Sequence, residues 1–198
     1  MKTIEQRNKI FFDKIARIYD SFLFRSLNKS PPEKIIKLIK VKENSKILDA
    51  GCGTGSLLYQ LLQQKKNLKL FGIDISPEML KIAMQKLKGN ANLMQMPVEK
   101  IKDKGKFDYI LSINAFHHYS SHEKAMKNFY RALKKNGRIM VVDFDFGFLL
   151  NKIFHWLEPG NNKMHSAFQI KELFEANEFK DIRQEKIGWF SVLSIGRK

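Results

Sequence analysis

The stretch that decides the fold is Ile47-Leu48-Asp49-Ala50-Gly51-Cys52-Gly53-Thr54-Gly55-Ser56. An apolar run ends at an acidic residue, glycines follow at three alternate positions, and a helical pattern begins at Leu57. This order predicts a strand, a tight turn and the start of a helix. Glycine allows positive φ angles and lets a ligand approach the main chain closely, and the free N–H groups at the helix start face the turn. The stretch therefore predicts a nucleotide-type site at the carboxyl edge of a parallel sheet.

The glycine spacing narrows the choice of ligand. A dinucleotide-binding fingerprint has the spacing Gly-x-Gly-x-x-Gly. Here the spacing is Gly-x-Gly-x-Gly, and Asp49 stands two residues before the first glycine. No Gly-Lys-Ser/Thr comes after it, which excludes a phosphate-binding P-loop. Glycines in this spacing are by themselves compatible with an ordinary turn, so the interpretation depends on the next segment of the chain.

A second strand–loop–helix unit comes directly after the first. Residues 68–73 predict a strand that ends at Asp74. A carboxylate at this place can accept two hydrogen bonds from a ribose diol. Ser76, Pro77 and Glu78 then supply an N-cap, a proline at the first helical position and an acid in the first turn. The apolar face of the predicted helix consists of Leu80, Ala83, Met84 and Leu87.

These two units carry a resemblance to a known family. Residues 49–55 and 72–80 resemble motifs I and II of class I S-adenosylmethionine (SAM)-dependent methyltransferases. The resemblance implies that the cofactor is SAM, with S-adenosylhomocysteine as its product. It also implies that the glycine turn holds the methionine end and that Asp74 holds the ribose hydroxyls. The cofactor-binding residues that it implies are Asp49, Gly51, Cys52, Gly53, Thr54, Gly55, Asp74, Ile75, Pro97, Val98, Ser112, Ile113 and Asn114.

One position departs from the family pattern. After a predicted third strand at 91–96, Pro97-Val98-Glu99 stands where the family usually has Asp-Ala-Glu. Proline therefore replaces the acid that commonly accepts a hydrogen bond from the adenine amino group. The N–H of Val98 can still donate to an adenine ring nitrogen, since that contact needs no side chain. We expect main-chain and apolar contacts to hold the adenine.

The segment after the fourth predicted strand, 107–112, bears on the substrate. Ile113-Asn114-Ala115-Phe116-His117-His118 resembles motif IV of small-molecule methyltransferases, which runs beside the methionine part of the cofactor and the acceptor. It is not the Asn/Asp-Pro-Pro-Tyr/Phe motif with which amino-methylating enzymes grip a flipped base. No Pro-Cys nucleophile for cytosine is present either. These absences count against a nucleic-acid substrate.

The beginning of the chain predicts an amphipathic helix whose apolar stripe packs on the domain. Residues 12–20 resemble the opening of the ubiquinone/menaquinone-biosynthesis methyltransferases, which in that group lies over the cofactor and substrate cleft. Tyr19 is therefore a candidate lid contact, and a core aromatic is the alternative. Pro31-Pro32 then breaks the chain, and a second helix is expected at 33–41. The stripe consists of Ile10, Phe11, Ile15, Ile18, Tyr19 and Phe22.

His117 is a candidate general base. The acceptor of a methyl group must lose a proton, and a histidine with a pKa near neutrality can take it. The alternative is structural, with one histidine packed at a helix start and the other solvated. No metal site is predicted, because His118 and His122 straddle a helix boundary and no cysteine or carboxylate ligand set accompanies them.

The later part of the chain predicts further helices and strands. A capping box at Ser120–Glu123 starts a helix that ends in a turn at 134–137, and 138–144 forms the fifth strand. A second capping box at Ser166–Gln169 starts the last helix, for which Asn177 supplies a left-handed end.

Two closing strands, 179–183 and 189–198, complete the predicted fold. The preceding segment, 145–168, is rich in phenylalanine. It is expected to cover an apolar or ring-bearing acceptor, or to complete the core, or to touch a membrane surface transiently with the help of nearby lysines.

Composition limits the remaining choices. The formal net charge is +16, but the lysines are spread over every segment and outnumber the arginines, which favours a lysine-rich surface over a nucleic-acid site. No apolar run approaches the ~20 residues that span a bilayer. No signal peptide is visible. The single cysteine, Cys52, excludes an internal disulfide and fits a reducing cytoplasm.

The sequence therefore predicts an α/β fold, a three-layer sandwich in which a Rossmann-like, mostly parallel seven-stranded sheet has helices on both faces and a reversed last strand. We expect a single domain of residues 1–198, with 1–44 as an N-terminal helical lid segment and 45–198 as the core. The predicted function is methyl transfer from SAM to a small-molecule acceptor. An RNA-directed methyltransferase and a non-catalytic SAM-binding module are alternatives, and no obligate protein partner is evident.

Overall fold

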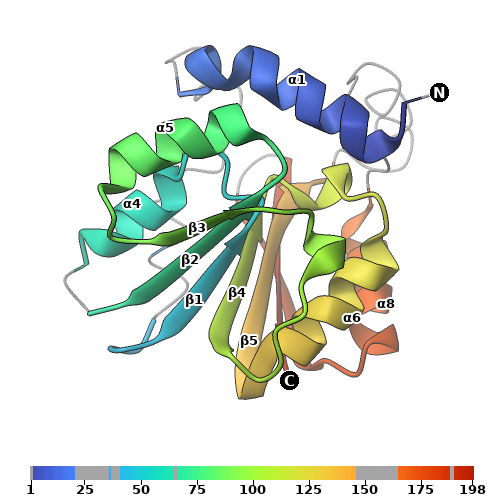
Figure 1. Cartoon of the computed structure of the whole chain (residues 1–198). Coiled ribbons are helices and arrows are strands. Elements are labelled where there is room, and N and C mark those ends of the chain that lie inside the picture. Colours follow the sequence, from blue (N-terminus) through green and yellow to red (C-terminus); the bar gives the residue numbers. More distant parts are fainter. Residues whose placement is uncertain (1, 21–35, 37–40, 65–66, 146–164, 188–189) are drawn as a thin grey trace.

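The structure is a computed structural model that describes residues 2–20, 36, 41–64, 67–145, 165–187 and 190–198 (Figure 1). Some of the predicted features fall outside these ranges. They are the helix at 33–41 except for residues 36 and 41, the last member of the apolar stripe, Phe22, and most of the predicted acceptor cover at 145–168.

A seven-stranded sheet forms the centre of the molecule. Its spatial order is β3-β2-β1-β4-β5-β7-β6. Neighbouring strands are parallel from β3 to β5, and β7 runs antiparallel to both β5 and β6. The predicted mostly parallel sheet with a reversed last strand is thus confirmed. The strands are β1 (Lys46–Ala50), β2 (Lys69–Asp74), β3 (Asn92–Gln95), β4 (Phe107–Ile113), β5 (Leu133–Phe144), β6 (Lys180–Lys186) and β7 (Ser191–Arg197).

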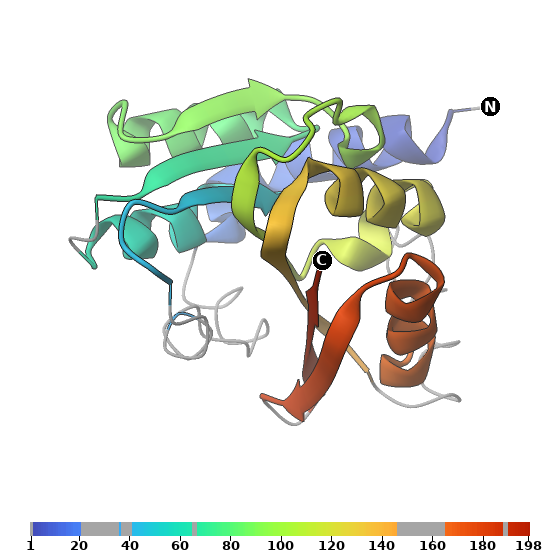
Figure 2. The same ribbon diagram turned by 90° about the horizontal axis from the view of Figure 1, so that it is seen from below.

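Helices cover both faces of the sheet, which confirms the predicted three layers (Figures 1 and 2). Helices α4 (Ser56–Leu62) and α5 (Pro77–Leu87) pack on one face. Helices α6 (His122–Ala132) and α8 (Ala167–Ala176) pack on the other. Two short 3₁₀ turns, η1 (Val98–Lys100) and η2 (Phe116–His118), come after β3 and β4. Of the helices in the described ranges, none combines the length and apolar character needed to cross a membrane.

The apolar core lies on both sides of the sheet. On the α4/α5 face, Leu58, Leu61 and Leu87 pack against buried strand residues. On the α6/α8 face, Phe129 and Phe174 are fully buried. Full burial of such a side chain contributes about 1.5–3 kcal/mol. These layers fix the strands rigidly and thereby fix the loops at their carboxyl ends.

The strand order reverses between β1 and β4, because β1 leads to β2 on one side while β4 leads to β5 on the other. In parallel α/β sheets such a switch point opens a crevice at the carboxyl ends of the strands. The loops after β1, β2 and β4 meet there. This is the edge at which the sequence predicts the ligand.

Helix α1 (Ile4–Tyr19) lies across this carboxyl edge beside α5 (Figure 1). The predicted apolar stripe is partly wrong, since Ile10 is 36% and Ile18 is 52% exposed. The buried residues of α1 are Asn8 and Ala16. The prediction is partly wrong because polar contacts of its side chains orient α1 more than burial of apolar surface does. Met84 of α5, which is 55% exposed, also departs from its predicted buried place.

Three predicted boundaries are corrected by one to five residues. The N-cap of α6 is Ser121, because Ser120 donates a hydrogen bond to Glu99 instead. The predicted turn at 134–137 belongs to β5, which begins at Leu133 and shifts its register against β4. The left-handed residue after α8 is Glu178, with φ of +64°, whereas Asn177 has φ of −107°. The capping box of α8 is confirmed.

Candidate active site

A pocket occupies the crevice at the carboxyl edge of the sheet, and α1 forms one of its walls. Its walls come from the glycine loop, the ends of β2 and β4, η1, η2 and α1. Of the cofactor-binding residues predicted from the sequence, those that line the pocket are Gly51, Gly53, Asp74, Ile75, Pro97, Val98, Ile113 and Asn114. The others, Asp49, Cys52, Thr54, Gly55 and Ser112, lie behind this wall.

The glycine loop needs its glycines for different reasons. Gly51, Gly53 and Gly55 have φ of +75°, +51° and +74°, a region that favours glycine. A Cβ at Gly51 would lie 2.6 Å from Ala115 Cβ, and one at Gly55 would lie 3.1 Å from Ala83 Cβ. A Cβ at Gly53 would meet nothing within 4 Å. Gly51 and Gly55 therefore allow close packing, while Gly53 presents its backbone to open space.

Backbone hydrogen bonds hold the loop against β2. The N–H groups of Gly51 and Cys52 both donate to the Ile73 carbonyl, at 2.8 and 3.0 Å. The N–H of Gly53 donates to Asp74 Oδ2 at 2.8 Å. The loop's shape thus depends on main-chain geometry that the glycines permit.

Asp74 has a structural role in addition to the predicted ribose contact. Its Oδ1 accepts from the Ser76 N–H at 2.9 Å, so the carboxylate joins the glycine loop to the start of α5. Burial raises the pKa of Asp74, and the N–H donors of Ser76 and Gly53 oppose that rise. Two carboxylate oxygens offer about four acceptor directions, so a ribose diol can still bind here.

Asp49 lies at the end of β1 and is only 3% exposed. Burial, together with the nearby charge of Asp74, raises the pKa of Asp49 to about 8. The group is therefore mostly protonated at neutral pH in the unliganded protein. Burial also raises the pKa of the Cys52 thiol, which fits its predicted role as a packing residue.

The end of β4 presents an acceptor that has no protein partner in the described ranges. Asn114 has φ of +51°, and its N–H donates to the Val142 carbonyl at 2.8 Å. Its buried Oδ1 has no hydrogen-bond partner among the described residues. A buried, unpaired acceptor is costly in an empty site, so this atom indicates a ligand that brings a donor.

Tyr119 is a residue that the sequence analysis missed. Its hydroxyl donates to the Ala50 carbonyl at 2.9 Å and lies 2.8 Å from Ser112 Oγ, so it joins the ends of β1 and β4. Burial raises its pKa well above the usual range, and the hydroxyl therefore keeps its proton. No pattern in the sequence marks this residue, because its partner Ala50 lies 69 residues away in the chain.

The two adjacent histidines take different places. His118 lines the pocket, whereas His117 is buried behind it with its ring centroid 3.9 Å from that of His118. His117 Nδ1 lies 2.5 Å from Asp143 Oδ1, and the backbone N–H of His117 donates to Asp143 Oδ2 at 2.9 Å. Burial alone would raise the pKa of Asp143, but the charge of His117 and hydrogen bonds lower it overall. The predicted candidate base, His117, thus does not border the pocket itself.

Helix α1 supplies the wall opposite the sheet. Its pocket-lining side chains include Asn8, Phe12 and the predicted lid contact Tyr19. Asn8 Nδ2 donates to the His118 carbonyl at 2.7 Å, and the Phe12 ring meets the His118 ring edge-on at 4.8 Å. Tyr19, the predicted lid contact, thus lines the pocket together with Phe12.

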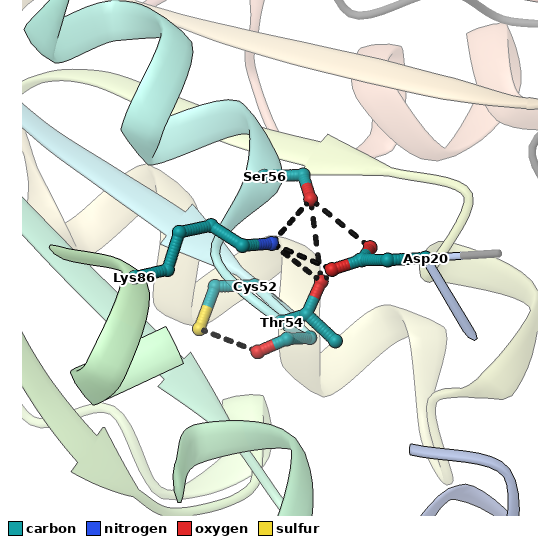
Figure 3. A network of polar contacts seen from close by, with 6 residues as sticks. Asp20, Cys52, Thr54, Ser56 and Lys86 are labelled. Carbon is teal, nitrogen blue, oxygen red and sulfur yellow. Dashed lines mark hydrogen bonds and ion pairs between the residues drawn. The ribbon is translucent and has the colours of Figure 1, made fainter. Parts of the chain in front are cut away.

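Two aspartates attach α1 to the core. Asp13 Oδ1 accepts from Ser76 Oγ at 2.6 Å, at the start of α5. Asp20, just after α1, accepts from Thr54 at 2.8 Å and from Lys86 at 2.7 Å (Figure 3). Burial would raise the pKa of each aspartate, but these donors and the lysine charges lower it overall. Thr54 therefore contacts Asp20 at the end of α1 and does not line the pocket.

Ser56 and Lys86 complete the cluster around Asp20 (Figure 3). Lys86 Nζ also donates to Ser56 Oγ at 2.8 Å and to Thr54 Oγ1 at 3.2 Å. Ser56 Oγ donates to Asp20 Oδ1 at 3.2 Å. One ammonium group thus connects the residue after α1, the glycine loop and the last turn of α5.

The pocket's charges suit a cationic ligand. Its acidic side chains are Glu5, Asp74 and Glu99, and no lysine or arginine of the described chain lines it. This contrasts with the formal net charge of +16. SAM carries a sulfonium and an ammonium group, so the wall charges and the unpaired Asn114 Oδ1 fit that molecule.

Known proteins resemble this chain over most of its length. A family described as "Methyltransferase domain" matches residues 41–189. The ubiquinone/menaquinone biosynthesis C-methyltransferase UbiE of Geotalea daltonii is 31% identical over 72% of this chain and 66% of that protein. The demethylmenaquinone methyltransferase of Lactococcus lactis is 26% identical over 98% of this chain and 90% of that protein.

A solved structure has the same fold. It is a chain of the complex between the Haloferax volcanii Trm112 methyltransferase activator and a putative methyltransferase. The TM-score is 0.82, with 17% identity over 94% of this chain and 96% of that one. The strand order, the glycine loop and the family match lead to one conclusion: the chain belongs to the methyltransferase domain family and is a class I SAM-dependent methyltransferase.

Proposed function

We propose that this methyltransferase acts on a small, apolar or ring-bearing acceptor that enters beneath α1. The observation that carries the proposal is the aromatic wall of Phe12, Tyr19 and His118 over a pocket that carries no described lysine or arginine. Such a wall suits an apolar ring better than a phosphate backbone. The relatives named for C-methylation of quinone precursors agree with this substrate class.

Each part of the cofactor has a fitting wall. The methionine end would lie over Gly51 and Gly53, with its ammonium group able to donate to Asn114 Oδ1. The ribose hydroxyls would reach Asp74, and the adenine would lie between Ile75 and Val98. We also infer that residues 1–44 act as a lid segment over a core of residues 45–198. The clamp of α1 by Asp13 and Asp20 supports this division.

Bound SAM supplies an electrophilic methyl group on a sulfonium. The chain's task is to align the acceptor with that methyl and sulfur and to exclude water, which accounts for large rate gains by itself. Helix α1 closes the pocket for this purpose. Where the acceptor must lose a proton, His118 and Tyr19 border the site, and His117 with Asp143 would position His118 from behind. Substitution of any one of these side chains should therefore reduce the rate of methyl transfer only modestly.

The assignment of the cofactor site can be tested by calorimetry with S-adenosylhomocysteine. Asp74→Ala removes the ribose acceptor and the bond to the Gly53 N–H, so affinity should fall at least about a hundredfold, since bonds to a charged group contribute about 1.5–3 kcal/mol each. Asp181→Ala, an exposed carboxylate on β6, is the matched control and should bind normally. Unchanged affinity of Asp74→Ala would contradict the proposed ribose site.

The acceptor class can be tested with tritium-labelled SAM. Label should pass into the lipid fraction or small-molecule fraction of a cell extract and not into bulk RNA. Label in RNA would support the RNA-directed alternative. Tight cofactor binding without transfer to any fraction would support a non-catalytic module.

A further inference from the structure

Helix α1 lies along the outside of the molecule, over the carboxyl edge of the sheet (Figure 1). An α-helix turns by about 100° per residue, so five of its exposed residues fall within an arc of about the same width. They form what we call the α1 outer face, which consists of Arg7, Ile10, Lys14, Arg17 and Ile18. The face combines three cations with two isoleucines and contains no acid.

The acids of α1 lie on the opposite side of the helix. Glu5 lines the pocket, and Asp13 and Asp20 attach the helix to the core. The ion pair within α1 joins Lys9 to Asp13 at 2.8 Å. In the part of the chain that the structure describes, no acid forms an ion pair with a cation of the α1 outer face. The positive charge of this face is therefore available to an anionic partner.

The two isoleucines narrow the kind of partner. Ile10 is 36% and Ile18 is 52% exposed, although burial of apolar area on the core would have turned both inward. A helix that lies at the surface of an anionic bilayer has this mixture of side chains. Its apolar residues enter the boundary between headgroups and acyl chains, while lysine and arginine extend to the headgroups.

Other partners match this face less well. The phosphates of a nucleic acid would attract the cations but offer nothing to the isoleucines. A second copy of the same face would bring the same cations and be repelled. An anionic bilayer supplies both negative headgroups and an apolar layer beneath them, so it complements the charges and the isoleucines together.

We propose that the α1 outer face docks on the surface of an anionic lipid bilayer. Ile10 and Ile18 enter the headgroup–acyl boundary, and Arg7, Lys14 and Arg17 contact lipid phosphates. Each cation near such a surface contributes about fivefold to affinity, so docking is weak and reversible. Because α1 is also a wall of the pocket, an apolar acceptor dissolved in the bilayer would arrive beside the site. The docking goes beyond the proposed function, and its test needs no acceptor.

Vesicle sedimentation tests the docking. The probe is a sucrose-loaded vesicle with equal parts of phosphatidylglycerol and phosphatidylcholine, and the control vesicle contains phosphatidylcholine alone. The protein should sediment with the anionic vesicles and much less with the neutral ones, and added salt should weaken this binding. Equal binding to both vesicles, or no binding to the anionic vesicles, would overturn the proposal.

An uncharged substitution separates a bilayer from other anions. Ile18→Gln keeps the charge of the face and should lower the affinity for the anionic vesicles about fivefold. Met94→Gln replaces a methionine that is 60% exposed on β3 and should leave the affinity unchanged. Equal effects of the two variants would contradict the proposal. Displacement of the vesicles by single-stranded RNA, with Ile18→Gln without effect, would assign the face to nucleic acid instead.

A charge substitution separates this face from the net charge of +16. Arg17→Gln should lower vesicle affinity about fivefold. Arg183→Gln removes the same charge from an exposed position on β6 and should change little. Unchanged melting temperatures and S-adenosylhomocysteine affinity in all four variants would show that the fold and the cofactor site persist. Equal losses at Arg17 and Arg183 would mean that net charge alone binds the vesicles, and the proposal would be wrong.

Discussion

The floor and the roof of the pocket are held by different kinds of interaction. The floor consists of the glycine loop 51–55 and the ends of β1, β2 and β4. Backbone hydrogen bonds and tight packing fix it, as at Gly51 against Ala115. The roof is α1, which buries only Asn8 and Ala16 along its length.

Polar side chains hold the roof. Asp13 and Asp20 attach α1 to the N-terminus of α5, the glycine loop and Lys86. Contacts of this kind are individually weak, because water competes for the same groups. The floor is thus formed when the protein folds, while the roof can move at small cost. We expect α1 to open for entry and exit of the cofactor without unfolding of the sheet.

The largest effect is expected in the floor at Gly51. Gly51→Ala introduces a Cβ at 2.6 Å from Ala115 Cβ and a side chain at φ of +75°. Stability should fall by about 3 kcal/mol, and cofactor binding should be lost. Gly105→Ala, which has positive φ but nothing within 4 Å, measures the backbone strain alone. Equal losses in chemical denaturation would show that the contact with Ala115 does not matter.

Asp49 should make the floor sensitive to pH. Its pKa is raised from 3.8 to about 8, so the folded state holds a proton that the unfolded state releases between these values. This group therefore favours folding below pH 3.8, and that contribution is lost as pH rises toward 8. Asp49→Asn removes this titration. The difference in free energy of unfolding between the two proteins should therefore change by about 1.4 kcal/mol for each pH unit between the two pKa values.

Denaturant titrations of both proteins between pH 6 and about 8 measure this difference. The substituted protein should gain relative stability as pH rises. A constant difference across that range would mean that Asp49 is not protonated in the folded protein.

A smaller effect is expected at Tyr119, which lines the pocket. Tyr119→Phe removes the hydrogen bond to the Ala50 carbonyl and the contact with Ser112. The cost should be about 1 kcal/mol of stability, with weaker S-adenosylhomocysteine binding because the end of β1 is less firmly held. Tyr109→Phe removes a hydroxyl from the same sheet, on the α4/α5 face, and is the control. Identical behaviour of the two variants would exclude a positioning role.

The smallest stability effect is expected in the roof. Asp20→Asn weakens the link to Lys86, whose side chain is 23% exposed, and should cost only about 0.5 kcal/mol. Stopped-flow measurements should nevertheless show faster release of S-adenosylhomocysteine. Asp103→Asn breaks a comparably exposed pair with Lys106 and should leave that rate unchanged.

Acid should weaken the attachment of α1, as Asp20→Asn does. The pKa values of Asp13 and Asp20 are lowered, so their contributions are present above the ordinary aspartate pKa and disappear as pH falls through the lowered values. An unchanged release rate in Asp20→Asn would show that the clamp does not hold α1 closed.

Much of the floor was predictable because it depends on local sequence. Alternating glycines after an apolar run, and the Ser76-Pro77 helix start, have strict backbone requirements that the residues themselves reveal. The clamp by Asp13 and Asp20 and the hydroxyl of Tyr119 were not predicted. Their partners Thr54, Ser76 and Ala50 are 34 to 69 residues away, and no local pattern records such distances.

The sequence by itself determined the order of strands and helices, the ligand class and the turn that holds it, since periodicity and glycine spacing are set by neighbours in the chain. Tertiary structure alone decided which histidine borders the pocket and which face of α1 turns inward. Those outcomes depend on contacts between distant segments, where packing and charge act only once the chain has folded.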